Sequence, residues 1–428
     1  MKKVFLIILL GLILVGCGKE KNRIPNAAAS EAKEPETAEP EEPTAAEDKE
    51  EGKVVTDEVI IDSMAEEILN QMTIEEKIGQ MFLVNLEGLD NSQGNYYEHR
   101  AFTKRMQRSL KKYGVGGVIL FSRNIETRNQ TIKLIQKLQN HSKVPLWVAV
   151  DEEGGDVARI ANNENMGTTK FPSMWEVGAN ENEDYAYDMG STIANDISAL
   201  GFNLDFAPVA DVKTNETNTE IGNRSFGDDA DKVASMVCAV VKGLQDNGVS
   251  AALKHFPGDG DVEGDTHFSS VNIDNDLNRL RNVDFVPFKE GIKAGVDFVM
   301  VSHISISRVA GNTTPASLSN LVMKTILRNE LEFKGLIITD AMDMKAITNH
   351  YSAAEAAVKS VKAGADIVLE PADFQDAYNG VYNAYINGKI TEERINDSVL
   401  RNLKMKIKQG IILSNSDLIP EDSSLTYK

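Results

Sequence analysis

The sequence predicts an α/β protein, a (β/α)8 TIM-type barrel formed by a single catalytic domain. Eight short apolar runs recur along the chain, and continuous runs of this kind are typical of parallel strands buried on both faces. They occupy residues 81–86, 116–121, 145–151, 202–211, 250–256, 298–304, 335–340 and 364–370. Amphipathic segments with helical spacing separate many of these runs, at residues 125–141, 184–200, 229–247 and 319–332. Strand–helix alternation with eight strands favours a closed barrel over an open doubly wound sheet, since no GxGxxG motif follows any run.

The first 16 residues have the pattern of a bacterial lipoprotein signal peptide. Lys2 and Lys3 precede the apolar run VFLIILLGLILVG, which is shorter than the ~20 residues that a membrane span needs. The run leads into LVGC, so we interpret Cys17 as the lipidated mature N-terminus. The lipid would anchor the protein on the extracellular face of the cell membrane. An ordinary signal peptide or a short anchor is the alternative.

An acidic tether is predicted to follow Cys17, over residues 17–56. Stretches such as EAKEPETAEPEEPTAAEDKEEGK contain almost no large apolar residue, so they cannot bury a core and should stay disordered and extended. The tether would lift the catalytic domain off the membrane. A solvated tail without a role is the alternative.

The catalytic domain is predicted at residues 57–415. A helix at about 61–79 begins it, a helix at about 391–409 closes it, and a polar tail follows at 416–428. The hydrophobic fraction of 42% is enough for a large core. No composition shift indicates a second domain.

Composition disfavours two further classes of protein. The formal net charge of −20 repels phosphate backbones, so we expect no binding to nucleic acid. With only Cys17 and Cys238, the chain has no disulfide framework. Cys238 lies in the apolar stretch VASMVCAVV, where we expect a buried, inert thiol, because nothing nearby would lower its pKa.

Polar and charged residues cluster where the apolar runs end. They are Asp151, Asp205, Asp211, Lys254, His255, His303 and Asp340. The C-terminal ends of all barrel strands meet on one face, which holds the active site, so these distant residues should converge on one pocket. The alternative is that each residue merely ends its strand in solvent. That alternative accounts poorly for Lys254 and His255, which extend an apolar run with two ionisable side chains.

Two catalytic interpretations of this face are open alternatives. A metal-dependent hydrolase would gather several histidines at strand ends, whereas the chain has six, and His99, His141 and His350 fall in predicted helices or loops. A Schiff-base aldolase would use Lys254 as its nucleophile. The acidic neighbours of Lys254 would raise its pKa rather than lower it, which disfavours that chemistry.

Glycoside hydrolysis needs a nucleophile or base on one side of the sugar and a proton donor on the other. The segment IITDAMDM supplies the carboxylate of Asp340 at a strand end. The segment GDTH supplies Asp265 and His267, which face the same way in an extended chain. Asp265 can hold one imidazole nitrogen of His267 and leave the other free to exchange a proton near neutral pH.

Four segments in order resemble glycoside hydrolase family 3, and specifically its β-N-acetylglucosaminidases. They are DEEGGDVARI, IGNRSFG, KHFPGDGDVEGDTH and IITDAMDM. The resemblance covers about residues 60–410. It implies a retaining mechanism with a covalent glycosyl-enzyme, a carbohydrate substrate from peptidoglycan turnover, and no metal or organic cofactor.

The resemblance also implies a role for individual residues. Asp340 matches the nucleophile, His267 the acid/base, and Asp265 its partner, with the last two on a mobile loop after the fifth strand. The predicted sugar-binding residues are Asp151, Arg159, Arg224, Lys254 and His255, with His303 as an additional pocket residue. A structural ion pair is the alternative for Arg159 and Arg224. We expect the glycines of KHFPGDGDVEGDTH to act as a hinge-like spacer between the sugar-binding pair and the acid/base pair.

The sequence departs from the family pattern at two positions. Asp259 replaces a common His, and Asp156 stands where a basic residue is common. Both departures bear on fine substrate specificity and not on the type of reaction. We interpret Asp259 as a turn residue between Gly258 and Gly260, and Asp343 as a structural residue that begins the next helix.

The sequence therefore predicts a membrane-tethered, monomeric exo-β-N-acetylglucosaminidase (a β-N-acetylhexosaminidase) that acts on cell-wall fragments. A β-glucosidase or a glycoside phosphorylase of the same family is the enzymatic alternative. A sugar-binding lipoprotein without turnover is the non-enzymatic alternative.

Overall fold

Eight parallel strands form the barrel that the sequence predicts, in a computed structural model that describes residues 57–94 and 96–414. The order around the sheet is β10-β1-β2-β3-β6-β7-β8-β9, and a parallel bridge between Ile338 and Ile367 joins its two ends. The strands are β1 (Phe82–Val84), β2 (Gly117–Ile119), β3 (Trp147–Val150), β6 (Leu204–Asp205), β7 (Ser250–Phe256), β8 (Phe298–Val301), β9 (Leu336–Thr339) and β10 (Val368–Leu369). Each lies within one of the eight predicted runs, so the fold class is confirmed. The predicted signal peptide, the lipidated Cys17, the tether and the polar tail lie outside the described residues.

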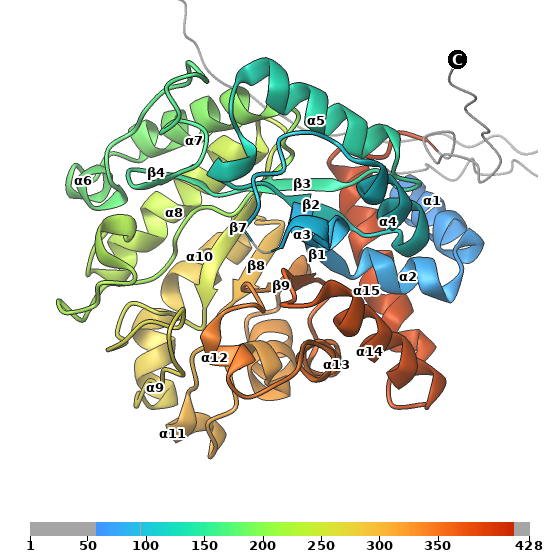
Figure 1. The fold of residues 1–428 in the computed structure, drawn as a ribbon. Helices are drawn as coiled ribbons and strands as arrows, with labels where there is room; N and C mark the ends of the chain where they lie inside the picture. Colours follow the sequence, from blue (N-terminus) through green and yellow to red (C-terminus); the bar gives the residue numbers. More distant parts are fainter. Residues whose placement is uncertain (1–56, 95, 415–428) are drawn as a thin grey trace, which may run out of the picture. The chain divides into compact units, whose positions relative to one another are not determined.

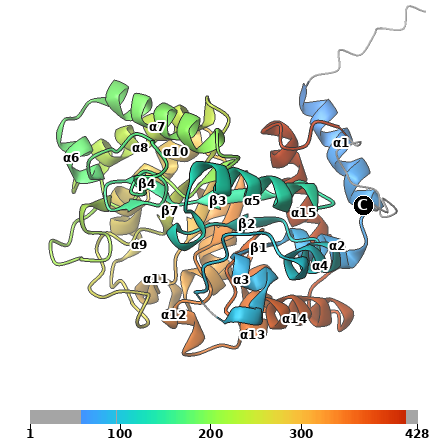
Figure 2. The same ribbon diagram turned by 45° about the horizontal axis from the view of Figure 1, so that its top comes forward.

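Helices surround the strands, as Figure 1 shows, and the turned view in Figure 2 shows α5, α7, α8, α13, α14 and α15 distributed around them. The longer helices are α1 (Asp57–Gln71), α4 (Lys104–Tyr113), α5 (Arg128–Asn140), α7 (Glu183–Ser198), α8 (Ala230–Gln245), α10 (Val286–Lys293), the π-helix η6 (Leu321–Glu330), α13 (Ala353–Ala363), α14 (Phe374–Ile386) and α15 (Glu392–Lys408). The shorter ones are α2 (Ile74–Gln80), α3 (Leu86–Leu89), α6 (Met174–Ala179), α9 (Leu277–Arg279), α11 (Ser307–Ala310) and α12 (Lys345–Thr348).

The first predicted helix, at 61–79, is wrong as a single element. The structure divides it into α1 and α2 at Thr73, whose hydroxyl accepts a hydrogen bond from the Glu76 amide at 3.3 Å. The Glu76 carboxylate accepts the Thr73 amide in return, at 3.1 Å. This reciprocal capping box satisfies the open N–H groups of a new helix start, so the chain begins a second helix although the apolar spacing continues.

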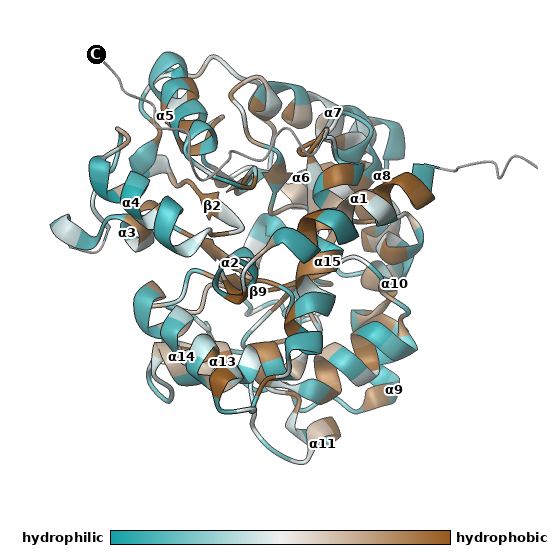
Figure 3. Ribbon diagram, turned by 90° about the vertical axis from the view of Figure 1, so that its right-hand side faces the viewer, coloured by the Kyte–Doolittle hydropathy of each residue, from teal (hydrophilic) through white to brown (hydrophobic). Residues whose placement is uncertain are grey.

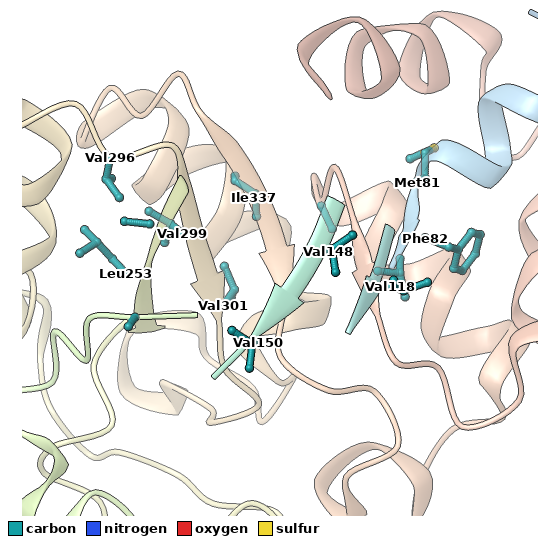
Figure 4. Close-up of a cluster of buried hydrophobic side chains, with 14 of the residues drawn as sticks. Met81, Phe82, Val118, Val148, Val150, Leu253, Val296, Val299, Val301 and Ile337 are labelled. Carbon is teal, nitrogen blue, oxygen red and sulfur yellow. The ribbon is translucent and has the colours of Figure 1, made fainter. Parts of the chain in front are cut away.

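Two apolar layers form on opposite faces of the strands because side chains alternate. Trp147 and Ala149 of β3 point into the barrel and belong to its interior cluster, which also contains Phe298. Val148 and Val150 point outward against the helices, where Figure 4 shows them beside the outward residues of neighbouring strands. The helices that cover this layer are two-sided, and α13, α14 and α15 carry both hydrophobic and hydrophilic residues in Figure 3.

Helix α15 closes the end of the barrel opposite the predicted site. Asn402 accepts a hydrogen bond from the Trp147 indole at 2.7 Å inside the barrel. Lys406 has no exposed surface, and its Nζ donates to Gln80 Oε1 and to the Gly116 carbonyl, both at 2.9 Å. Both acceptors precede strands, so α15 is held to the N-terminal ends of β1 and β2. None of the helices within 57–94 and 96–414 combines the length and apolar character that crossing a membrane requires.

Burial lowers the pKa of Lys406 to about 7, because both of its acceptors are neutral. Between about pH 7 and 10 the unfolded chain binds a proton at Lys406 that the folded chain does not. The free energy of unfolding should therefore rise with pH across that window, by up to about 1.4 kcal/mol per pH unit. Urea unfolding of Lys406→Met should lack this rise relative to the parent chain.

The matched control is Lys404→Met on the same helix, since Lys404 pairs with Asp62 at 2.8 Å and is partly exposed. The free energy of unfolding of Lys404→Met should rise with pH as it does in the parent. If the free energy of unfolding rose equally with pH in Lys406→Met and in the parent, the lowered pKa of Lys406 would be contradicted.

Candidate active site

The C-terminal ends of the strands bring the predicted residues together, as the barrel geometry requires. Asp151 follows β3, and Lys254 and His255 lie near the end of β7. His303 follows β8, and Asp340 directly follows β9. The convergence predicted from the apolar runs is therefore present in the structure.

A short hairpin after β3 turns Arg159 back onto Asp151. The hairpin pairs β4 (Glu152–Gly154) with β5 (Val157–Ala158), and the buried Glu152 carboxylate accepts the amides of Ile160 and Ala161, both at 2.7 Å. The Arg159 amide donates to the Asp151 carbonyl at 3.1 Å, and its guanidinium lies 3.6 Å from the Asp151 carboxylate. Burial raises the pKa of Glu152 to about 7, against the two amides that favour its charged form.

Glu153 lies at the centre of a buried ion network that sequence reasoning missed. Its carboxylate accepts the Arg224 guanidinium through two hydrogen bonds, at 2.7 and 2.9 Å. Nζ of Lys254 lies 2.6 Å from the same carboxylate and 2.9 Å from Asp151 Oδ1. The signal was available in DEEGGDVARI, where two further carboxylates follow Asp151, but nothing in the sequence indicates which cations they meet.

The network keeps Lys254 charged. Burial lowers the pKa of Lys254, but the carboxylates of Asp151 and Glu153 outweigh it and raise the pKa above its ordinary value. Burial likewise raises the pKa of Glu153, and Arg224 and Lys254 reverse this and hold it far below the ordinary range. A charged amine is a poor nucleophile, which weighs against the Schiff-base alternative.

Arg224 has fewer free donors than a sugar-binding residue would use. Two nitrogens bond to Glu153, Nη1 donates to the Glu220 carbonyl at 3.3 Å, and Nη2 lies 3.4 Å from Nε2 of His255. The structural ion pair that the sequence left open is therefore present. Sugar contact by Arg224 and Arg159 stays a prediction, with 21% and 32% of their side chains exposed.

Asp211 organises the turn after β7. Its carboxylate, which has no exposed surface, accepts Nδ1 of His255 at 2.7 Å and the amides of His255 and Asp259 at 3.1 and 2.7 Å. The other imidazole nitrogen of His255 thus points toward Arg224. The Lys254–His255 and Phe256–Pro257 peptide bonds are cis.

The expected hinge-like glycine spacer is wrong for the first half of the loop. Gly258 and Gly260 are buried, and a Cβ on Gly260 would lie 1.8 Å from the Val212 carbonyl. Gly258 has a φ of +122°, a conformation that glycine adopts without strain. Both glycines therefore serve close backbone packing rather than motion.

Asp259 is more than a turn residue, because only 2% of it is exposed and its carboxylate accepts the Ser302 hydroxyl at 2.9 Å. Its carbonyl accepts the Asn218 side chain at 2.6 Å. Burial and then the nearby Asp211 raise the pKa of Asp259 well above its ordinary value. Asp259 therefore joins the β6, β7 and β8 loops as a structural residue, which explains its presence without a catalytic role.

Asp340 lies at the end of β9 with its carboxylate accepting the amide of Ala341 at 2.7 Å. Burial raises the pKa of Asp340, but His255, His303, the Ala341 amide and His267 together outweigh it. The net pKa is below the ordinary value, so Asp340 is ionised at neutral pH. An ionised carboxylate at this place can act as a nucleophile.

His303, predicted as a pocket residue, is only 1% exposed and bonds to protein through both ring nitrogens. Nε2 lies 2.9 Å from the Ala341 carbonyl, and Nδ1 lies 2.7 Å from the Ser317 hydroxyl. Since a carbonyl only accepts, Nε2 is the protonated nitrogen. This geometry holds the Ala341 peptide beside Asp340, and sugar contact by His303 stays a prediction.

Asp265 and His267 form the predicted pair on the loop after β7. Asp265 Oδ1 accepts the amide of His267 and lies 2.8 Å from its Nδ1. Within the described residues no group bonds to Nε2, and 59% of the His267 side chain is exposed. Glu220, which the sequence reasoning missed, lies 3.6 Å from the same Nδ1.

The carboxylates keep His267 protonated at neutral pH. Contact with Glu220 raises its pKa most, burial of the ring opposes this, and Asp265 and Asp340 raise it further, to about 9. A protonated imidazole with a free Nε2–H is a proton donor.

Two features adjoin this arrangement. Glu220, Asp265 and His267 offer atoms within 4.8 Å of one another, a separation that could accommodate a cation, but internal hydrogen bonds occupy the carboxylates and we assign no metal to them. A cavity of about 370 Å3 opens beside Arg224, lined chiefly by the hairpin and by residues 213–224.

Cys238 is half-buried, and burial raises its thiol pKa to about 11, in agreement with an inert role.

The comparisons with known proteins agree with this geometry. Residues 73–405 match the family model for the N-terminal domain of glycosyl hydrolase family 3. β-Hexosaminidase A of Pseudoalteromonas piscicida is 34% identical over 342 residues, which are 72% of this chain and 57% of that protein. A β-hexosaminidase of Xylella fastidiosa is 36% identical over 280 residues, which are 64% of this chain and 81% of its own.

Solved structures show the same likeness. A family 3 β-N-acetylglucosaminidase from Paenibacillus sp. FPU-7 is 34% identical with a TM-score of 0.74, and the match covers 79% of this chain and 63% of that one. A β-glucoside phosphorylase, BglX, is 25% identical with a TM-score of 0.73, covering 84% of this chain and 63% of that one. The chain thus spans less than two thirds of several proteins that it matches.

Replacing Glu153 with Gln should strongly destabilise the domain, because Arg224 would be left without its anion and Lys254 with one of two. Removing one partner of a buried ion pair costs about 3–5 kcal/mol. Urea unfolding of Glu153→Gln should show a free energy of unfolding that is lower than the parent's by this amount.

The control is Glu330→Gln, which removes the same forked contact at the surface, between Glu330 and Arg281. Exposed ion pairs contribute little to stability, so the urea midpoint of Glu330→Gln should stay close to that of the parent. Equal midpoints for both variants would exclude a structural role for the buried network.

Proposed function

The chain belongs to glycosyl hydrolase family 3, and on that premise we propose that it hydrolyses terminal β-linked N-acetylglucosamine from glycans with retention of configuration. One observation carries the proposal: Asp265 bonds to His267 at 2.8 Å and leaves its Nε2 free, while an ionised carboxylate, Asp340, lies at the end of β9. A proton donor and a nucleophile are the two groups that a retaining glycosidase needs.

In the first step, Nε2 of His267 gives its proton to the glycosidic oxygen as the bond from that oxygen to C1 breaks. An Asp340 oxygen forms a bond to C1, so the leaving group departs as a neutral alcohol. The pKa of about 9 keeps His267 protonated before this step. Asp265 stabilises the imidazolium through Nδ1 and holds the ring in place.

In the second step, water attacks C1 and the bond from C1 to Asp340 breaks. The neutral Nε2 of His267 takes a proton from that water and returns to its starting state. The sugar leaves with the configuration it had at C1, since two displacements restore it. The charged Lys254 and its carboxylate partners are proposed to hold the sugar hydroxyls during both steps.

Selectivity for N-acetylglucosamine is supported by the relatives, whose names are β-hexosaminidase and β-N-acetylglucosaminidase. The phosphorylase among the structural neighbours supports a second candidate, in which phosphate replaces water in the second step. A panel of aryl β-glycosides, assayed with and without phosphate, separates these possibilities. We expect release of free N-acetylglucosamine that does not depend on phosphate, and a sugar 1-phosphate product would identify a phosphorylase.

Asp340→Ala should abolish turnover of an aryl β-N-acetylglucosaminide, because no bond to C1 can form. His267→Ala should lower kcat/KM by about 10²–10⁴-fold for substrates with poor leaving groups. It should have a much smaller effect when the leaving group is an activated phenol that needs no proton. Full activity of both variants would exclude the proposed reaction.

We also propose that Cys17 carries a lipid that holds the enzyme on the outer face of the cell membrane, close to peptidoglycan fragments. Cys17→Ser should then move the protein from the membrane fraction to the soluble fraction in the organism's cells, detected by immunoblotting. Metabolic labelling with a fatty acid should be lost in parallel. Unchanged membrane recovery of the variant would contradict the lipid anchor.

A further inference from the structure

The loop that carries the acid/base pair is held by one buried residue. From 263 to 270 only Thr266 is buried, with 1% of its surface exposed, whereas its neighbours are half-buried or exposed. Thr266 lies between Asp265 and His267. Whatever fixes Thr266 therefore fixes the position of both members of the pair.

Glu220, on the loop after β6, holds Thr266 from two sides. Its Oε1 accepts the Thr266 hydroxyl at 2.6 Å, and its Oε2 accepts the Thr266 amide at 3.2 Å. The Glu220 side chain is only 7% exposed, so these bonds lie in a largely dry environment where they are strong. The Thr266 carbonyl accepts the Ala346 amide, at 3.2 Å, from the segment that follows Asp340.

Glu220 contacts three residues around the pocket. Its carbonyl accepts Nη1 of Arg224, its carboxylate holds Thr266, and Oε1 lies 3.6 Å from Nδ1 of His267. At 3.6 Å this last contact is an ion pair rather than a hydrogen bond. The acid/base loop therefore meets the loop after β6 at the Glu220 side chain. The segment after Asp340 meets the acid/base loop at the Thr266 carbonyl.

We propose that Glu220 is a positioning residue, which pins the acid/base loop through Thr266 and supplies a second carboxylate to Nδ1 of His267. This inference rests on the proposed function for its catalytic meaning. Glu220 touches no reacting atom, so it acts through His267. Its two effects are separable, because the hydrogen bonds set the position of the loop and the charge sets the protonation of the imidazole.

Several charged or titratable groups face His267 from the surrounding elements. They are Asp265 on its own loop, Glu220 after β6, His303 after β8, and Asp340 and Asp343 after β9. Glu220 and Asp265 are in direct contact with Nδ1. Removal of the Glu220 charge should therefore move the titration of His267 toward its ordinary value, and Asp265 and Asp340 should retain part of the shift.

Three variants test the proposal in the full chain. Glu220→Gln keeps the size of the side chain and one of the two acceptors for Thr266, but it removes the charge and places an NH2 group where the second acceptor was. Thr266→Val keeps the Glu220 charge and removes the hydroxyl. The matched control is Glu216→Gln, since Glu216 is an exposed acid on the same loop.

NMR titration of the histidine rings reports His267 without any substrate, with its signal assigned by its loss in His267→Asn. A chelator in every sample removes adventitious cations. We expect Glu220→Gln to lower the titration midpoint of His267 by roughly one pH unit and Thr266→Val to change it less. Glu216→Gln should leave it unchanged. A midpoint for Glu220→Gln equal to the parent's would overturn the proposal.

Turnover of aryl β-N-acetylglucosaminides gives the second readout. Glu220→Gln should lower kcat by about tenfold for poor leaving groups, with little change for activated ones, and KM should stay close to the parent's. The alkaline limb of kcat/KM should move to lower pH by the same amount as the NMR midpoint. An equal loss for all leaving groups, with an unmoved limb, would indicate a merely structural residue.

The two proposals fail in different ways. If the parent chain turns over no glycoside, the proposed function fails, and the NMR titration still decides whether Glu220 governs His267. If the parent is active and Glu220→Gln retains the parent's His267 midpoint, only the inference about Glu220 fails.

Discussion

The pocket depends on one buried carboxylate, that of Glu153, because it compensates two cations that come from other elements. Lys254 arrives from β7 and Arg224 from the loop after β6. Among the described residues, Lys254 also pairs with Asp151, and Arg224 forms no other ion pair. Buried charges are tolerated only when they are paired. The β3 hairpin, the β6 loop and β7 must therefore adopt one relative arrangement.

The acid/base pair is supported in a different manner. Asp265 and His267 lie on an exposed loop whose principal attachment is Thr266, while Asp340 lies at the end of a strand inside the barrel. Asp340, the proposed nucleophile, is thus fixed by the fold, through Ala341 and His303, whereas His267, the proposed proton donor, is fixed by a few hydrogen bonds. Attachment at a single buried residue leaves the rest of this loop with few buried contacts, and such segments open at lower cost than strand ends.

Much of the fold followed from simple patterns. Runs of continuous apolar residues located all eight strands, because a strand buried on both faces has few alternatives. The prediction of one helix over 61–79 was wrong because the Thr73 capping box starts a second helix within a continuous apolar spacing. The glycines after Lys254 were misread because a glycine needed for close packing and a glycine needed for motion look alike in sequence. Only the Val212 carbonyl near Gly260 separates the two.

By itself, the sequence determined the barrel, the end of it that holds the chemistry, and the local pairing of Asp265 with His267, since two residues so near in the chain have few ways to miss each other. The tertiary structure alone decided that Glu153 joins Lys254 to Arg224, that His303 bonds to the Ala341 carbonyl, and that Glu220 meets Thr266. Each of these contacts links segments that lie far apart in the chain. Residue types predict that a buried charge needs a partner, but the partner is selected only when the strands close and bring distant loops to the same face.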